Sequence, residues 1–149
     1  MLLAITKYFH PKETVHGDYV TSLSNRNSVP ANGNQKFGEL KVSGKGFNIN
    51  YLTISFDDTK PDLDRTLVTV QRYKSDFPII DKATLREIAN PRSKTNPFYI
   101  MNFNTRKGSL QVVPDNGLEV ILESKVSIDP NDIEFTFKGY RYIIIGDKK

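Results

Sequence analysis

The stretch that decides the fold is Ile133-Glu134-Phe135-Thr136-Phe137-Lys138-Gly139-Tyr140-Arg141-Tyr142-Ile143-Ile144-Ile145. Apolar and polar side chains alternate along it on both sides of a Lys-Gly pair. Alternation with a period of two residues is typical of a half-buried β-strand. A Lys-Gly pair also accepts the positive φ that a two-residue turn requires. The stretch therefore predicts a β-hairpin with its turn at Lys138-Gly139.

The two halves of this hairpin are expected to share one apolar stripe. The apolar residues of 133–137 would point to one side, and Tyr140, Tyr142 and Ile144 would continue the stripe after the turn. The alternation stops at Ile143-Ile144-Ile145, so both faces of the strand need cover there. An uncovered edge strand of this kind is prone to aggregate, which predicts a second sheet or another subunit against it.

Strand-like segments recur along the rest of the chain, and glycine, asparagine and proline separate them. The turn sequence Pro114-Asp115-Asn116-Gly117 ends in a dipeptide typical of hairpins, and Ser43-Gly44-Lys45-Gly46 also joins two strands. One short helix is expected near 82–89, capped by Asp81 and ended by Asn90-Pro91. The expected strands are 2–9, 13–21, 37–43, 46–56, 66–73, 97–103, 109–113, 117–127, 132–138 and 140–145.

These elements predict one all-β domain over residues 1–149. A single short helix cannot supply the crossovers that a parallel sheet needs, so the sheets are expected to be mostly antiparallel. About ten short strands favour a β-sandwich, with a closed β-barrel as the alternative. The sequence contains no cysteine, which excludes disulfides, iron–sulfur clusters and thiol nucleophiles.

One polar segment, residues 22–36, departs from the strand pattern. It is rich in asparagine and almost free of large apolar side chains. Loops longer than about 12 residues are uncommon in compact domains and are usually binding elements or mobile. We therefore expect a long polar loop or arm that contacts a neighbouring subunit. Its candidate interaction residues are Asn25, Arg26, Asn27, Asn32 and Asn34.

Four aspartates within eight residues are weak candidates for a metal site. Divalent hard cations bind several oxygen ligands at close range. The spacing does not match an EF-hand loop, however, and Lys60 and Arg65 would compete as counter-charges. A solvated loop with turns closed by aspartate side chains is therefore favoured over a metal site. The four residues are Asp57, Asp58, Asp62 and Asp64.

No familiar catalytic pattern is present in the sequence. His10 and His16 are the only histidines, and neither lies in a Gly-x-Ser-x-Gly or His-Glu-x-x-His frame. Histidine is the usual general base, so almost any hydrolytic mechanism would have to use one of these two, and an enzyme with a carboxylate-based or metal-assisted site is a third alternative. We therefore expect no enzyme activity and no cofactor.

The positive charge of the chain is concentrated between residues 72 and 107. Eight basic and three acidic residues give this window a net charge of +5, although the whole chain carries only +4. Cationic surfaces with aromatic platforms bind single-stranded nucleic acids. Alternating apolar residues in the same window also fit a buried face with solvated loops, which is favoured. The candidate nucleic-acid-binding residues are Arg72, Lys74, Arg92, Lys94, Tyr99, Arg106 and Lys107.

The sequence thus favours a non-catalytic structural or interaction domain. It would act as an accessory subunit of a larger assembly such as a virus particle, with other protein subunits as partners in a homo- or hetero-oligomer. That expectation rests on fold-level analogy. The alternative is a nucleic-acid-binding β-barrel that uses the 72–107 surface. No apolar run approaches the ~18 residues of a membrane span, and the first residues do not resemble a signal peptide, so synthesis in the cytoplasm without a membrane partner is expected.

Overall fold

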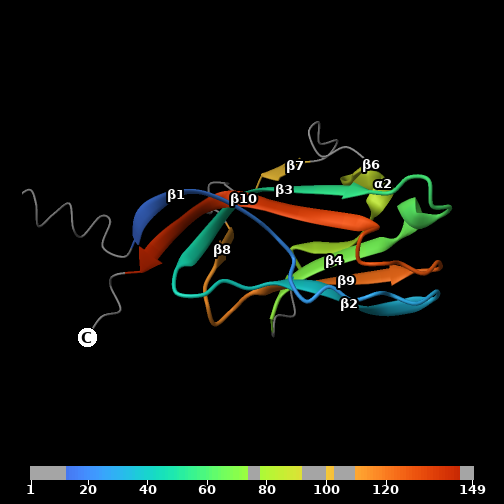
Figure 1. Cartoon of the computed structure of the whole chain (residues 1–149), viewed down its shortest axis with the longest axis horizontal. Helices are drawn as coiled ribbons and strands as arrows, with labels where there is room; N and C mark the ends of the chain where they lie inside the picture. Colours follow the sequence, from blue (N-terminus) through green and yellow to red (C-terminus); the bar gives the residue numbers. More distant parts are fainter. Residues whose placement is uncertain (1–12, 74–77, 92–99, 103–109, 145–149) are drawn as a thin grey trace, which may run out of the picture.

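The computed structural model describes residues 13–73, 78–91, 100–102 and 110–144, which form two β-sheets packed face to face (Figure 1). Sheet A has the order β1-β10-β3, and three short strands pair with the far edge of β3. Sheet B has the order β2-β9-β4-β5. The strands are β1 (Glu13–Ser22), β2 (Gly33–Leu40), β3 (Gly46–Phe56), β4 (Leu67–Arg72), β5 (Ile80–Thr84), β6 (Asn90–Pro91), β7 (Ile100–Asn102), β8 (Leu110–Val112), β9 (Leu118–Ser124) and β10 (Ile133–Ile144).

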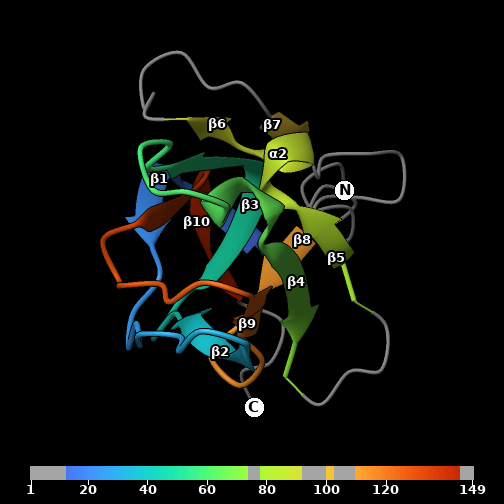
Figure 2. The same ribbon diagram turned by 90° about the vertical axis from the view of Figure 1, so that its right-hand side faces the viewer.

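The predicted antiparallel sandwich is confirmed. Over the described residues the strands form two separate sheets rather than one sheet closed into a barrel. All pairs are antiparallel except the two-residue contact of β6 with β3. Figure 2, seen from the end where α2 (Leu85–Ile88) lies, shows β2 and β9 beneath β3 and β10. The expected strand 2–9 lies outside the described residues.

The core lies between the sheets and consists of alternate residues of the long strands. In β10, Ile133, Phe135 and Phe137 are buried, whereas the residues between them are partly exposed. Phe135 meets Phe37 of β2 across the sandwich, with ring centroids 6.1 Å apart. The apolar stripe predicted for 133–137 therefore faces the opposite sheet. Its other buried neighbours in the core include Leu52, Ile54, Val68, Val70, Val120 and Leu122.

The predicted hairpin turn at Lys138-Gly139 is wrong. Residues 133–144 form one strand of 12 residues that pairs with β1 on one side and with β3 on the other. Gly139 lacks the positive φ of a two-residue turn; Gly44, at 77°, is the described glycine that has one. β10 is therefore an interior strand of sheet A.

Gly139 marks a β-bulge instead. The register between β10 and β3 shifts at this residue, and Asn50 of β3 is left without a partner in β10. A Cβ atom at position 139 would lie 1.8 Å from the carbonyl oxygen of Asn48. The glycine is needed because the β3 backbone approaches closely, which is a common reason for glycine inside a strand.

The continuity of β10 also corrects the predicted single stripe. The strand pairs with β1 without a shift from Thr136 to Tyr140. Because successive side chains alternate between faces, Tyr140 lies on the face opposite Phe137. Tyr142 lies near it, with ring centroids 6.5 Å apart. Of the isoleucine triplet, the structure describes only the backbone of the first two residues, so the predicted two-sided cover falls outside the described side chains.

The helix is shorter than predicted and begins later. Residues 80–84 form β5, which pairs with β4, so Asp81 is a strand residue rather than a cap. The cap of α2 is Thr84: its hydroxyl accepts the Glu87 N–H, while the Glu87 carboxylate accepts the Thr84 N–H. This reciprocal capping box sets the helix start. Leu85 and Ile88 anchor the single turn in the core.

The predicted turn at 114–117 is present but does not make a hairpin. The Asn116 N–H donates to the Val113 carbonyl at 3.0 Å. β8 before this turn pairs with β3 in sheet A, whereas β9 after it pairs with β2 and β4 in sheet B. The turn at 43–46 likewise joins β2 of sheet B to β3 of sheet A. Both turns therefore carry the chain between the layers.

Among the described residues, no helix is both long enough and apolar enough to cross a lipid bilayer.

Candidate functional site

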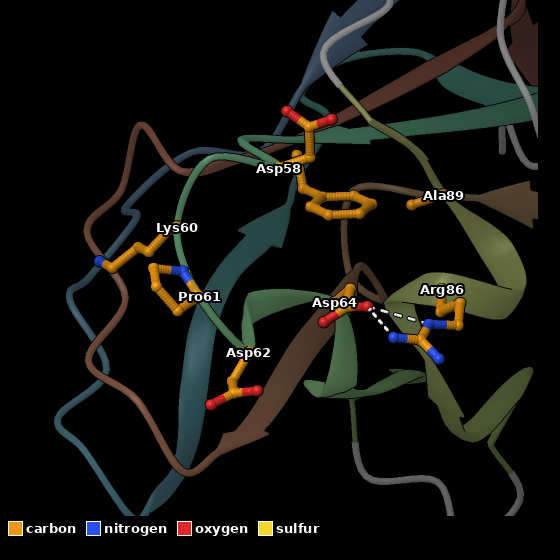
Figure 3. A pocket seen from close by; sticks show the side chains of 8 residues that line it. Asp58, Lys60, Pro61, Asp62, Asp64, Arg86 and Ala89 are labelled. Atoms are coloured by element: carbon orange, nitrogen blue, oxygen red, sulfur yellow. Dashed lines mark hydrogen bonds and ion pairs between the residues drawn. The ribbon is translucent and has the colours of Figure 1, made fainter.

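A pocket of about 540 Å³ opens at the end of the sandwich, where the connection from β3 to β4 faces α2 (Figure 3). We call it the end pocket. Its apolar lining comes from Phe56, Pro61 and Ala89. Phe56 and Ala89 are only 5% and 1% exposed. Its charged lining consists of Asp58, Lys60, Asp62, Asp64 and Arg86.

The loop along the end pocket is held by its own side chains. The Asp57 carboxylate accepts the backbone N–H of Thr59 at 3.0 Å and also its hydroxyl. This is the aspartate turn that the sequence favoured. A short 3-10 helix, η1 (Leu63–Arg65), follows, and the fully buried Leu63 anchors it. The loop is thereby tied down at both ends.

Both cations of the end pocket are bound by carboxylates. Arg86 of α2 donates through Nε to Asp64 at 2.9 Å and also through Nη2 to the same oxygen. Lys60 pairs with Asp132 at 2.7 Å. Figure 3 shows the Lys60 ammonium turned away from the other labelled side chains.

The aspartates proposed as weak metal ligands are not brought together. Asp58 and Asp62 lie at opposite ends of the end pocket, and Asp64 is directed toward Arg86 (Figure 3). Asp57 is engaged in its own loop. Within the described ranges, no three carboxylate or histidine side chains gather as a metal ion would require.

A second candidate surface lies on the outer face of sheet A. Val20 of β1 pairs with Lys138 of β10, which pairs with Tyr51 of β3, so the three form one row across three strands. We call it the outer row. Val20 is 56% exposed and Tyr51 44%, and they are the exposed large apolar residues of the described chain. The row is therefore a local apolar patch around one cation.

A buried carboxylate fastens the segment 22–36 to sheet B. Glu39 of β2 is 6% exposed. The Lys36 ammonium at 3.0 Å, with the hydrogen bonds of Asn25 and Tyr73, lowers the pKa of Glu39 from 4.5 to about 2, against the opposing effect of burial. Lys41 lies 3.3 Å away and acts in the same direction. Burial, and then the bond to Glu39, raises the pKa of the Tyr73 hydroxyl.

The depressed pKa predicts how acid affects stability. The Glu39 carboxylate is protonated below about pH 4.5 in the unfolded chain but only near pH 2 in the folded chain. Its contribution to stability is therefore present above pH 4.5 and is lost toward pH 2. We expect the free energy of unfolding of the wild type to exceed that of Glu39→Gln by on the order of 2 kcal/mol at neutral pH. This difference should shrink as the pH falls. Urea unfolding of both proteins across this range measures it, and a pH-independent difference would contradict it.

The predicted arm lies against the body of the protein. Val29 is fully buried and bridges to Ile128, and residues 33–36 belong to β2. Arg26 donates to the Pro130 carbonyl at 3.2 Å, and the Asn27 N–H donates to Phe37. The arm interpretation is corrected because buried apolar anchors and strand pairing hold the segment. Its role in contacts with a neighbour stays a prediction.

Two adjoining hollows of about 500 and 450 Å³ lie on the outer face of sheet B. They share Asn34, Leu67 and Glu123 and together touch all four strands. Lys82 approaches Glu123 to 3.9 Å there. Of the predicted interaction residues, Asn34 lines both hollows, and Asn32 lines one.

Most of the predicted nucleic-acid-binding residues lie outside the described chain. The exception is Arg72, whose guanidinium donates to the Gln111 carbonyl at 2.6 Å and thereby links the two sheets. The outside residues are Lys74, Arg92, Lys94, Tyr99, Arg106 and Lys107.

Sequence reasoning missed the outer row as a site. Alternation in 46–56 is sufficient to place Tyr51 on the face opposite Leu52, and alternation in 133–138 places Lys138 opposite Phe137. The signal that was lacking is the pairing of β3 and β1 with the same interior strand, which aligns Tyr51 and Val20.

Comparison of the chain with protein-family models, with curated proteins and with solved structures finds no match.

Proposed function

We propose that this protein is a non-catalytic contact domain whose outer row packs against another protein subunit. The observation that carries the proposal is the position of Val20 and Tyr51. These exposed large apolar side chains flank Lys138 in one cross-strand row instead of being scattered. Clustered apolar exposure is typical of an interaction surface, whereas single exposed residues are ordinary.

The chemistry of the row suits a protein partner. Tyrosine is enriched at the centres of protein interfaces because it buries a large area and retains a polar end. Full burial of one large apolar side chain stabilises by about 1.5–3 kcal/mol, so half-exposed Val20 and Tyr51 each offer a fraction of that. Lys138 between them can pair with a carboxylate of the partner. A contact of this size also needs the surface next to the row, on the outer face of sheet A.

The proposal places the protein as an accessory subunit of a larger assembly such as a virus particle. Synthesis in the cytoplasm and later incorporation into the particle belong to the same proposal. Compact β-domains commonly serve in such assemblies, so the support here is analogy of fold.

We expect the double variant Val20→Glu/Tyr51→Glu to lose association while it remains folded. Two carboxylates in the row oppose burial against any apolar partner surface. Light scattering on purified protein tests contact with a second copy, and pull-down from the source tests contact with other subunits. The control is Ser127→Glu, which adds one carboxylate, half the charge of the double variant, at an exposed position between β9 and β10.

The native mass in the source decides the proposal. Wild type is expected in a species well above the 17.0 kDa of one chain, and the double variant is expected at the mass of one chain. Wild type recovered only as a single chain, or a double variant that assembles like Ser127→Glu, would contradict the outer row as the contact.

A further inference from the structure

We propose that the end pocket binds a cationic group on an apolar stem, such as the arginine or lysine side chain of a partner protein. This inference concerns a site at the end of the sandwich and does not depend on the outer row. Its first support is the shape of the cavity. About 540 Å³ falls in the range of pockets that enclose a small ligand or a single long side chain.

The apolar lining of the end pocket explains why the proposed ligand has an apolar stem. Phe56, Pro61 and Ala89 line the end pocket, and the first and last of these are almost fully buried. Arginine and lysine place their methylene groups along surfaces of this kind and keep the charged head at the rim. The phenyl ring of Phe56 adds an aromatic group, which attracts a cation placed over its face.

The charged lining of the end pocket explains why the proposed ligand is a cation. The end pocket contains three carboxylates and two cations. Arg86 is held by Asp64, and Lys60 is held by Asp132, a fourth carboxylate just outside the lining. Asp62 is exposed and takes part in neither of these two ion pairs, so its carboxylate gives the pocket a negative charge at that end. A cleft of one sign with apolar walls concentrates ligands of the opposite sign.

The same geometry disfavours a metal ion as the occupant. A divalent cation needs several oxygens that converge at close range. Asp58 and Asp62 instead lie at opposite ends of the cavity (Figure 3). A ligand with one charged end can place that end at Asp62 and its apolar stem along Phe56, Pro61 and Ala89, and a protein side chain gains further affinity from the chain that carries it.

The test is an amide NMR titration of the folded protein with three probes. The first is a short leucine-flanked peptide with one arginine, the second is the same peptide with neutral citrulline in its place, and the third is spermidine as a free cation. We expect the arginine peptide to shift the amides of 57–65 and 86–89. We expect the citrulline peptide to bind roughly fivefold more weakly, which corresponds to one partly exposed ion pair.

The variant Asp62→Asn isolates the charge. Asp62 is exposed and has a φ of 63°, a backbone conformation that asparagine also tolerates. We expect it to weaken the arginine peptide roughly threefold and to leave the citrulline peptide unchanged. The control Asp115→Asn removes an exposed carboxylate in the turn between β8 and β9 and should change neither.

Three results would overturn the proposal. Equal binding of both peptides would show that the positive charge is not recognised. Shifts confined to other amides, or no shifts up to roughly 10 mM peptide, would show that the end pocket is not the binding site. Spermidine bound in the end pocket more tightly than the arginine peptide would show that a free cation, rather than a protein side chain, is the occupant.

Discussion

Gly139→Ala is expected to destabilise the protein by about 3 kcal/mol or more, because the new methyl group meets backbone that cannot move aside. The added Cβ would lie 1.8 Å from the carbonyl oxygen of Asn48 and 3.0 Å from the Cα of Ile49. Relief requires β3 to separate from β10, the pair that joins the two longest strands of sheet A. At this chain length the melting temperature should fall by roughly 10 °C.

Two further variants separate the bulge from a turn. Gly44→Ala is the matched control, because Gly44 has a φ of 77° and nothing within 4 Å of its added Cβ. It should cost only about 1 kcal/mol of backbone strain. Gly139→Asn would be tolerated in a two-residue turn, where asparagine accepts positive φ, but should be as damaging as alanine in the bulge. A mild effect of Gly139→Asn in thermal melts would restore the hairpin interpretation.

Deleting residues 22–36 is expected to abolish cooperative folding. The deletion removes the fully buried Val29, the nearly buried Leu23 and the four residues of β2 that pair with β9 from Ser124 to Ile121. Thermal unfolding followed by near-ultraviolet circular dichroism measures the result. A deleted protein with a sharp transition would show that the segment is dispensable.

Point variants make this test less drastic. Val29→Asp places an unpaired carboxylate in the core and should cost about 3–5 kcal/mol. Asn27→Ala is the control, because Asn27 is exposed and its hydrogen bond to the Phe37 carbonyl, at 2.8 Å, is donated by its backbone N–H, which alanine keeps. Its effect should lie within about 0.5 kcal/mol. Similar losses in the two variants would contradict the anchoring role of Val29.

The strands were predictable because side-chain alternation is a local property. The predicted range 46–56 coincides with β3, and 13–21 and 66–73 match β1 and β4 within one residue at each end. The helix was harder, because Asp81 and Thr84 are both suitable caps. Thr84 is the cap because residues 80–84 are held in a strand by their pairing with β4, so the helix can begin only after them.

The candidate sites were less predictable than the strands. The aspartate cluster marked the loop of the end pocket. The pocket's other wall, however, comes from Arg86 of α2 and from Ala89 directly after it, more than 20 residues further along the chain. The asparagine-rich composition of 22–36 concealed two buried anchors, Leu23 and Val29. A single apolar residue in a polar segment produces no periodic hydrophobic pattern from which its burial could be predicted.

By itself, the sequence determined the all-β class, the positions of most strands and the side of β10 that Ile133, Phe135 and Phe137 face. Only the tertiary structure decided which strands pair. Of the neighbours in sequence, β4 and β5 alone form a pair within the described chain. Backbone hydrogen bonds between strands do not depend on side-chain identity, so the pairing follows from packing the two apolar faces together. The same packing keeps β10 extended past Gly139, where β3 bulges. The local sequence there fits a turn equally well.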